Sequence, residues 1–161
     1  MIFYFAYGSN MDEKQMRERC PDARFVSVAR LDDFKLDFTI HSPKRQCGCA
    51  DVVFARGEKT YGILYEMSAA DILRLDGFES VPTAYIRNTK GVKSADGKMH
   101  KAFVYEVADK KEFIAPSADY LNLILNAAQK HSFPKDYTQG LVTLIPQINN
   151  EIPNRGHGIR G

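Results

Sequence analysis

The chain has 161 residues, with 22 Lys or Arg against 20 Asp or Glu, which gives a formal net charge of +2. Because the two signs are interspersed and no run approaches the ~18 apolar residues of a membrane span, we expect no nucleic-acid or membrane partner. We expect a cytoplasmic protein, since no basic region precedes a signal-type apolar stretch. Its three cysteines, Cys20, Cys47 and Cys49, are expected to be reduced thiols.

The length favours a single domain over residues 1–161, and we find no internal repeat or linker rich in Pro, Gly or Ser. At this size, folding buries roughly 70% of the surface that the unfolded chain exposes, which allows a core and an enclosed pocket. Residues 149–161 have little apolar content and are predicted to form a polar C-terminal tail.

The start of the chain predicts a buried strand that ends in a glycine turn. Residues 2–7 are apolar and aromatic on both faces, which is typical of a central strand. After Gly8, Asn10 followed by Glu13 indicates a capped helix through about Arg19. The first N–H groups of such a helix lack partners at the positive end of its dipole, so this corner suits an anion. A tight turn that needs only glycine and a cap is the alternative.

Four short strands, a helix and a hairpin are predicted next. The strands are placed at residues 25–29, 34–40, 49–54 and 61–67. Ser68 caps the helix, and Gly77 is expected to stop it. Two runs, 85–92 and 99–107, flank an Asp-Gly pair that indicates a hairpin.

Two more helices are predicted near the C-terminal end. One opens at Pro116-Ser117 and carries an apolar stripe that includes Tyr120, and the other begins at Pro134. Both stripes are interpreted as core.

Glu79 is the candidate for acid/base chemistry. It follows the helix that ends near Gly77 and has Phe78 and Val81 beside it in sequence, so partly apolar surroundings would raise its pKa toward the range useful for proton transfer. A solvent-facing loop glutamate is the alternative. Asp76 is interpreted as a surface helix residue.

No metal site and no catalytic triad are predicted. Cys47 and Cys49 with His41 and Cys20 lack a second paired motif of the kind that zinc sites use. The other histidines have no carboxylate at a useful spacing, so a Ser–His arrangement has no support.

Several motifs in a fixed order resemble the γ-glutamylcyclotransferase family. They are Phe5-Ala6-Tyr7-Gly8-Ser9-Asn10, Val28-Ala29-Arg30-Leu31, Asp33-Phe34-Lys35-Leu36-Asp37-Phe38, Tyr61-Gly62, Leu75-Asp76 with Glu79 and Val81, Tyr85, Pro116-Ser117 with Tyr120, and Pro134 with Tyr137. The resemblance covers roughly residues 2–145, nearly the whole chain on the scale of a domain.

The resemblance implies an α+β fold, a small mixed β-barrel with packed helices. It also implies an enzyme that needs no cofactor or metal: the α-amine of a γ-glutamyl compound attacks its own side-chain amide carbonyl, releasing 5-oxoproline and a free amine or amino acid. The family's acid/base falls on Glu79. Its substrate-binding loop falls on Tyr7, Gly8, Ser9, Asn10 and Met11. From the residues themselves, Tyr85 and Tyr120, and also Tyr105, are candidates for the cavity wall.

Two alternatives stay open. The leaving group could be that of a γ-glutamyl-amine, γ-glutamyl-lysine or glutathione, because the loop and Glu79 contact only the shared glutamyl part. The chain could instead be a non-catalytic module that binds a small carboxylate. Two positions depart from the family pattern: Met11 stands where leucine is usual, and Ser80 follows Glu79 where glycine is common in close relatives.

Overall fold

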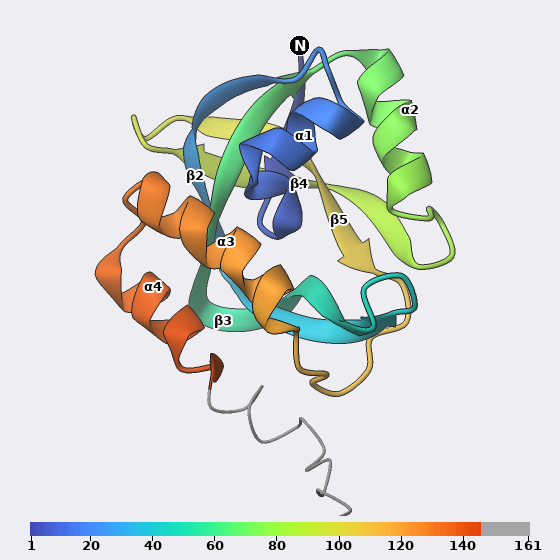
Figure 1. Cartoon of the computed structure of the whole chain (residues 1–161). Helices are drawn as coiled ribbons and strands as arrows, with labels where there is room; N and C mark the ends of the chain where they lie inside the picture. Colours follow the sequence, from blue (N-terminus) through green and yellow to red (C-terminus); the bar gives the residue numbers. More distant parts are fainter. Residues whose placement is uncertain (146–161) are drawn as a thin grey trace, which may run out of the picture.

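The computed structural model describes residues 1–145, which form a closed β-barrel with helices packed beside it (Figure 1). Its elements are β1 (Ile2–Ala6), the 3₁₀ turn η1 (Ser9–Met11), α1 (Glu13–Arg19), β2 (Arg24–Ser42), β3 (Cys47–Met67), α2 (Ala69–Phe78), β4 (Tyr85–Ser94), β5 (Met99–Val107), α3 (Ala118–Lys130) and α4 (Lys135–Val142). The predicted α+β barrel with packed helices is confirmed. The predicted tail at 149–161 lies outside the described residues.

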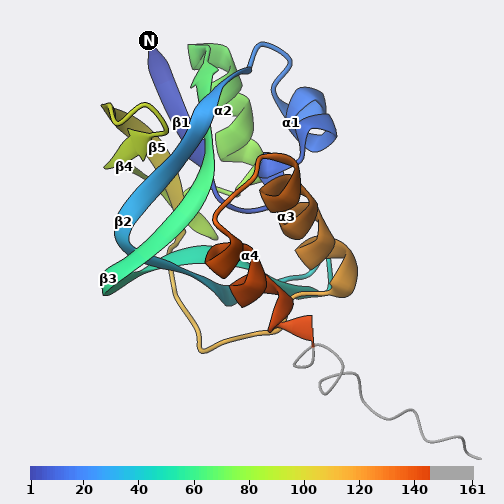
Figure 2. The same ribbon diagram turned by 90° about the vertical axis from the view of Figure 1, so that its left-hand side faces the viewer.

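The strand order around the barrel is β1-β3-β2-β4-β5. A parallel pairing of β1 with β5, at Tyr4 and Phe103, closes the barrel, and the other neighbours are antiparallel. β1 is therefore a central strand, as predicted, and its Phe5 and Ala6 are fully buried. Figure 2 shows α1, α3 and α4 on one side of the barrel. None of the helices in residues 1–145 has the length and apolar content that crossing a membrane requires.

The four short strands predicted between residues 25 and 67 are in fact two long, bent strands, β2 and β3. Polar residues that suggested loops mark irregularities within these strands. The register shifts between Asp32 and Phe34, and the intervening Asp33 has φ 65°. Gly57 on β3 has φ 84° and donates its N–H to Asp33 Oδ1 at 2.9 Å. Such bulges bend a strand without ending it, which a pattern of polar residues does not reveal.

The predicted hairpin and the last two helices are confirmed. Gly97 supplies the positive φ of the turn between β4 and β5. Ser117 caps α3 by accepting the N–H of Tyr120, and the apolar stripe of α3 is buried. Pro134 stands at the N-cap position of α4.

The predicted cap of the first helix is wrong. Asp12 caps α1, since its side chain accepts the N–H of Gln15 at 3.0 Å. Asn10 lies one turn earlier, in η1, where its side chain is not used as a cap. An aspartate two residues further on fits the capping position equally well, and this frees Asn10 for other contacts.

The predicted stop of α2 at Gly77 is also wrong. Gly77 lies inside the helix, and the left-handed residue that ends it is Ser80, with φ 52°. The N–H of Val81 donates to the carbonyl of Asp76 at 3.0 Å, and the N–H of Ser80 to that of Gly77 at 3.2 Å. These two bonds form a Schellman cap, with Glu79 as the last residue before the turn.

Candidate active site

A cavity of about 370 Å³ lies where the β1–η1 loop, the end of α2 and the β2–β3 turn meet. Seven of the eight residues proposed for the site line it: Tyr7, Gly8, Ser9, Asn10, Glu79, Tyr85 and Tyr120. Met11 does not line the cavity, because its side chain is almost fully buried in the core. Tyr105, the third candidate tyrosine, lines it as well.

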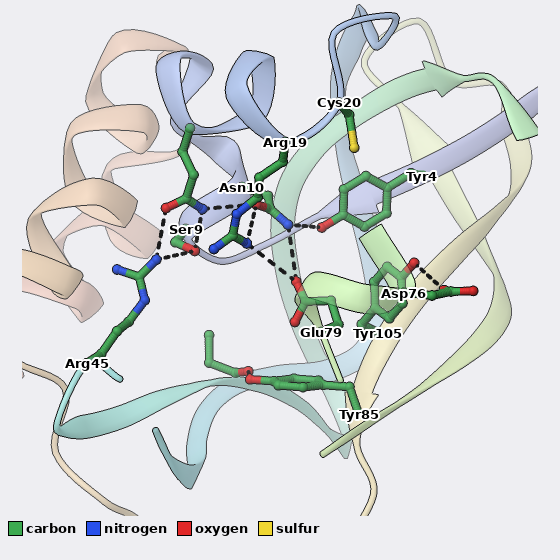
Figure 3. A network of polar contacts seen from close by, with 12 residues as sticks. Tyr4, Ser9, Asn10, Arg19, Cys20, Arg45, Asp76, Glu79, Tyr85 and Tyr105 are labelled. Atoms are coloured by element: carbon green, nitrogen blue, oxygen red, sulfur yellow. Dashed lines mark hydrogen bonds and ion pairs between the residues drawn. The ribbon is translucent and has the colours of Figure 1, made fainter. Parts of the chain in front are cut away.

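Asn10 is the centre of the polar network in this cavity (Figure 3). Its Nδ2 donates to the Tyr4 hydroxyl at 2.9 Å and to Glu79 Oε1 at 3.2 Å. Its Oδ1 accepts from Gln15 Nε2 at 2.9 Å and from Arg19 Nη1 at 3.1 Å. The amide has a partner at both ends, so its orientation is fixed and it holds the Glu79 carboxyl in place.

Glu79 is the C-cap residue of α2, and its side chain is only 17% exposed. Burial raises the pKa of this carboxyl above its usual value, and it outweighs the opposing effects of Arg19, Asn10 and Arg45. Arg19 Nη1 lies 4.0 Å from Glu79 Oε1, and its guanidinium also lies over the ring of Phe78. The carboxyl is thus partly shielded from water, as predicted.

The backbone of the β1–η1 loop offers unused donors. The N–H groups of Met11 and Asp12 are bonded within the turn, to the carbonyls of Gly8 and Ser9. Those of Ser9 and Asn10 donate to no acceptor in residues 1–145. Both residues line the cavity, so an anionic or carbonyl oxygen placed there can accept from them.

Gly8 is needed for the space that it leaves, and its φ of −113° lies outside the left-handed region. A Cβ at this position would lie 3.2 Å from Ala50 Cβ and 3.5 Å from the Tyr120 hydroxyl. The loop therefore passes β3 and α3 so closely that a side chain would press against the cavity wall.

The tyrosines of the wall are held by backbone groups. The Tyr85 hydroxyl donates to the Ala50 carbonyl at 2.8 Å, and the Ala50 N–H donates to the Tyr120 hydroxyl at 2.9 Å. The Tyr7 hydroxyl donates to the carbonyl of Tyr105. One residue of β3 thereby fixes a tyrosine from β4 and another from α3.

Asp76 is not the surface residue that the sequence suggested. Its carboxylate accepts from the Tyr105 hydroxyl at 2.7 Å and pairs with Arg87 at 2.6 Å. These contacts tie the end of α2 to β4 and β5, one helical turn before Glu79. The partners lie 29 and 11 residues away, so only the folded barrel brings them together.

Four further residues of the network were not found by sequence reasoning: Tyr4, Gln15, Arg19 and Arg45. Arg45 projects from the β2–β3 turn and donates to Gln15 Oε1 at 2.9 Å. Glutamine and arginine usually lie on solvent-facing surfaces, and nothing in the sequence pattern places these four side chains at a cavity.

The described part of the chain contains no group of three His, Cys, Asp or Glu side chains arranged as metal ligands. All three cysteines are free and buried. Cys49 lines the cavity, but burial raises the pKa of its thiol to about 11, so it is protonated near neutral pH. A protonated thiol is a poor nucleophile, so Cys49 is not suited to nucleophilic attack.

Comparisons with known proteins identify the family of this chain. A profile of the AIG2-like family matches residues 59–141. The gamma-glutamylcyclotransferase of Bos taurus is 32% identical over 150 residues, which cover 90% of this chain and 79% of the relative. The Homo sapiens protein of the same name is 31% identical, with the same coverage.

Solved structures give the same result. A structure titled gamma-glutamyl cyclotransferase superposes with a TM-score of 0.82 at 27% identity, covering 92% of this chain and 98% of the other. A yeast gamma-glutamyl cyclotransferase specific to glutathione reaches a TM-score of 0.70, covering 97% of this chain and 99% of the other, but at 12% identity this likeness concerns the fold alone. The chain belongs to the γ-glutamylcyclotransferase family of enzymes.

Proposed function

We propose that this protein converts γ-glutamyl compounds into 5-oxoproline and a free amino acid or amine. Family membership supplies the reaction class. The observation that carries the proposal is the partly buried carboxyl of Glu79, which Asn10 of the β1–η1 loop holds at the cavity. The reaction needs one group that accepts and then returns a proton, and Glu79 is the acid of the cavity wall.

The proton balance explains why this carboxyl has to be buried. An α-ammonium with a pKa near 8 must lose a proton before its nitrogen can attack, whereas an ordinary glutamate titrates near 4.3, a mismatch of roughly 5 kcal/mol. The raised pKa of Glu79 narrows that gap. Glu79 takes the proton, and the freed amine attacks the γ-carbonyl carbon to form the five-membered ring. Glu79 then protonates the departing nitrogen as the amide C–N bond breaks. The ring nitrogen gives up its surplus proton to the Glu79 carboxylate, which passes it to the released amine, so the products are a neutral lactam nitrogen and an ammonium group.

The loop and the tyrosines have binding roles in this proposal. The unused N–H groups of Ser9 and Asn10 would stabilise the oxygen that becomes negative during ring closure, or the carboxylate of the glutamyl part. Tyr7, Tyr85 and Tyr120 would form the wall against which the glutamyl chain packs. Met11, beneath the loop, would support it from the core.

The finer description of the protein is also part of the proposal. We propose a single domain over residues 1–161 that acts in the cytoplasm on a small-molecule substrate, without a cofactor or metal. One hydrophobic core joins the barrel to the helices packed beside it, which favours a single folding unit.

The test is detection of 5-oxoproline by mass spectrometry from a panel of γ-glutamyl amino acids, γ-glutamyl amines and glutathione. We expect wild-type protein to release it and Glu79→Gln to lose roughly 10²- to 10⁴-fold in rate, because this change removes proton transfer and keeps the shape. Glu58→Gln, on an exposed part of β3, is the matched control and should retain full activity.

Other outcomes are equally informative. Near-normal turnover by Glu79→Gln would remove this residue from the acid/base role. A silent panel together with measurable binding of 5-oxoproline would favour a non-catalytic module for small carboxylates.

A further inference from the structure

Arg45 is a cation at the cavity that has no acidic partner. Its Nη2 donates to Gln15 Oε1 at 2.9 Å and lies 3.5 Å from Ser9 Oγ, and its guanidinium carbon lies 4.9 Å from the centre of the Tyr120 ring. All three partners are neutral. No Asp or Glu in residues 1–145 forms an ion pair with Arg45, and its Nε and Nη1 donate to no acceptor there.

Arg45 lies where we expect the variable part of the substrate, its leaving group, to bind. Its turn, between β2 and β3, contributes the exposed lining residues Pro43 and Lys44, so it forms one rim of the cavity. Glu79 and the β1–η1 loop hold the reacting end. Figure 3 shows Arg45 and Glu79 on either side of Ser9, and the hydrogen bonds between them pass through Gln15 and Asn10. A leaving group must face the open rim in order to depart.

The charges around the cavity favour a substrate with a second carboxylate. Three cationic side chains line the cavity, those of Arg19, Lys44 and Arg45. Glu79 is the one acid among the described lining residues. Arg19 already lies near Glu79, and the N–H groups of Ser9 and Asn10 are available to the glutamyl part. The charge of Arg45 acts on Glu79 from a distance, but no Asp or Glu in the described part of the chain forms an ion pair with it. A leaving amino acid brings the carboxylate that an amine lacks.

We propose that Arg45 is a specificity residue that binds the α-carboxylate of the leaving amino acid. The substrates are then γ-glutamyl amino acids in preference to γ-glutamyl amines. This inference rests on the proposed function. The guanidinium stays stacked on Tyr120 while its unused N–H groups donate to the carboxylate, which replaces water around both charges.

The experiment compares two substrates that differ only in this charge, γ-glutamyl-alanine and γ-glutamyl-alaninamide. We expect wild-type protein to prefer the free acid by roughly 10- to 100-fold in kcat/KM, the size expected for a hydrogen bond to a charged group. Arg45→Met should remove that preference. Loss of this cation also raises the pKa of Glu79, which affects both substrates alike, so the ratio of the two kcat/KM values is the readout. Arg45→Lys should keep part of the preference, because the charge remains and the planar fork is lost.

Two control variants separate Arg45 from general charge. Arg56→Met changes an exposed arginine of β3 outside the cavity and should leave both substrates unaffected. Lys44→Met removes the neighbouring rim cation and should reduce the preference less than Arg45→Met does. Circular dichroism spectra and melting curves establish that each variant is folded.

Several results would overturn the inference. Equal use of the acid and the amide by wild-type protein would do so without any variant. An Arg45→Met protein that loses both substrates equally would assign Arg45 to the glutamyl carboxylate instead. If folded wild-type protein releases 5-oxoproline from neither substrate nor from the wider panel, the proposed function itself fails.

Discussion

Single contacts set the chemistry of this cavity, and the pKa of Glu79 is the clearest case. Burial raises it, while the Arg19 guanidinium, the Asn10 amide and the Arg45 guanidinium act in the opposite direction. The carboxyl is thus a stronger base than an exposed glutamate. Arg19 acts on this pKa from 4.0 Å, at the wall of the cavity.

The effect of Arg19 can be measured as a pH dependence. Glu79 must be ionised to act as a base, so kcat/KM should rise with pH through its pKa and fall again as the substrate ammonium titrates near pH 8. Arg19→Met removes a cation that lowers the Glu79 pKa. We therefore expect the acid limb of the profile to move to higher pH, with activity lost on the acid side and the alkaline limb unchanged. An acid limb that stays in place would show that Glu79 does not set it.

Gly8 gives a second prediction at this scale. Gly8→Val places methyl groups against Ala50 and the Tyr120 hydroxyl, where even a Cβ is already within 3.5 Å. We expect binding of 5-oxoproline to weaken at least about 10-fold and the free energy of unfolding to fall by about 1–3 kcal/mol through overpacking. Calorimetric titration and urea denaturation measure the two effects. Unchanged binding in a folded Gly8→Val protein would contradict the assignment of this loop to the substrate.

At the scale of helices and strands, local rules identified most elements but missed their ends. The hairpin turn and the caps Ser68 and Ser117 were predictable because each depends on neighbours within a few residues. Asp12 and Asn10 are both residue types that cap helices well. In the folded barrel Asn10 donates to Glu79 instead, so Asp12 is the cap and the first helix begins later than predicted.

Local sequence motifs also account for which residues of the site were predicted. The β1–η1 loop and Glu79 could be located because each is part of a short motif in the sequence. Their partners could not, since Arg19, Arg45 and the Asp76 pairs depend on which strands lie next to one another. Periodicity predicts burial, but not which distant side chain a buried polar group will meet.

The left-handed residue at the end of α2 lowers the stability of the folded protein by a measurable amount. Ser80 adopts a left-handed conformation that costs a residue with a Cβ roughly 1–2 kcal/mol, and glycine avoids that cost. Ser80→Gly should therefore raise the free energy of unfolding by about 0.5–1 kcal/mol, after the greater flexibility of glycine in the unfolded chain is subtracted. Urea denaturation tests this, with Gly97→Ala as the opposite control, because Gly97 has φ 85°. A destabilised Ser80→Gly protein would mean that the serine side chain makes a compensating contact.

At the scale of the whole molecule, one buried carboxylate hydrogen-bonds to several strands of the barrel beside the cavity. Asp51 on β3 is fully buried, and next to it in sequence is Ala50, whose backbone fixes Tyr85 and Tyr120. The Asp51 carboxylate accepts from Thr39 of β2 and from the N–H of Val107 at the end of β5. Three strands are thereby held at the level where the cavity begins.

Replacing this carboxylate should loosen the barrel and the cavity together. Asp51→Asn leaves one acceptor oxygen and turns an NH₂ group toward donors from Thr39, Val107 and Lys110, so at least one buried donor loses its partner. We expect the free energy of unfolding to fall by about 2–4 kcal/mol. Lys110→Met should cost less, since this lysine is 37% exposed and the carboxylate keeps its other donors. Equal losses in the two variants, measured by urea denaturation, would mean that the ion pair with Lys110, and not the set of donors from three strands, holds the barrel closed around its active site.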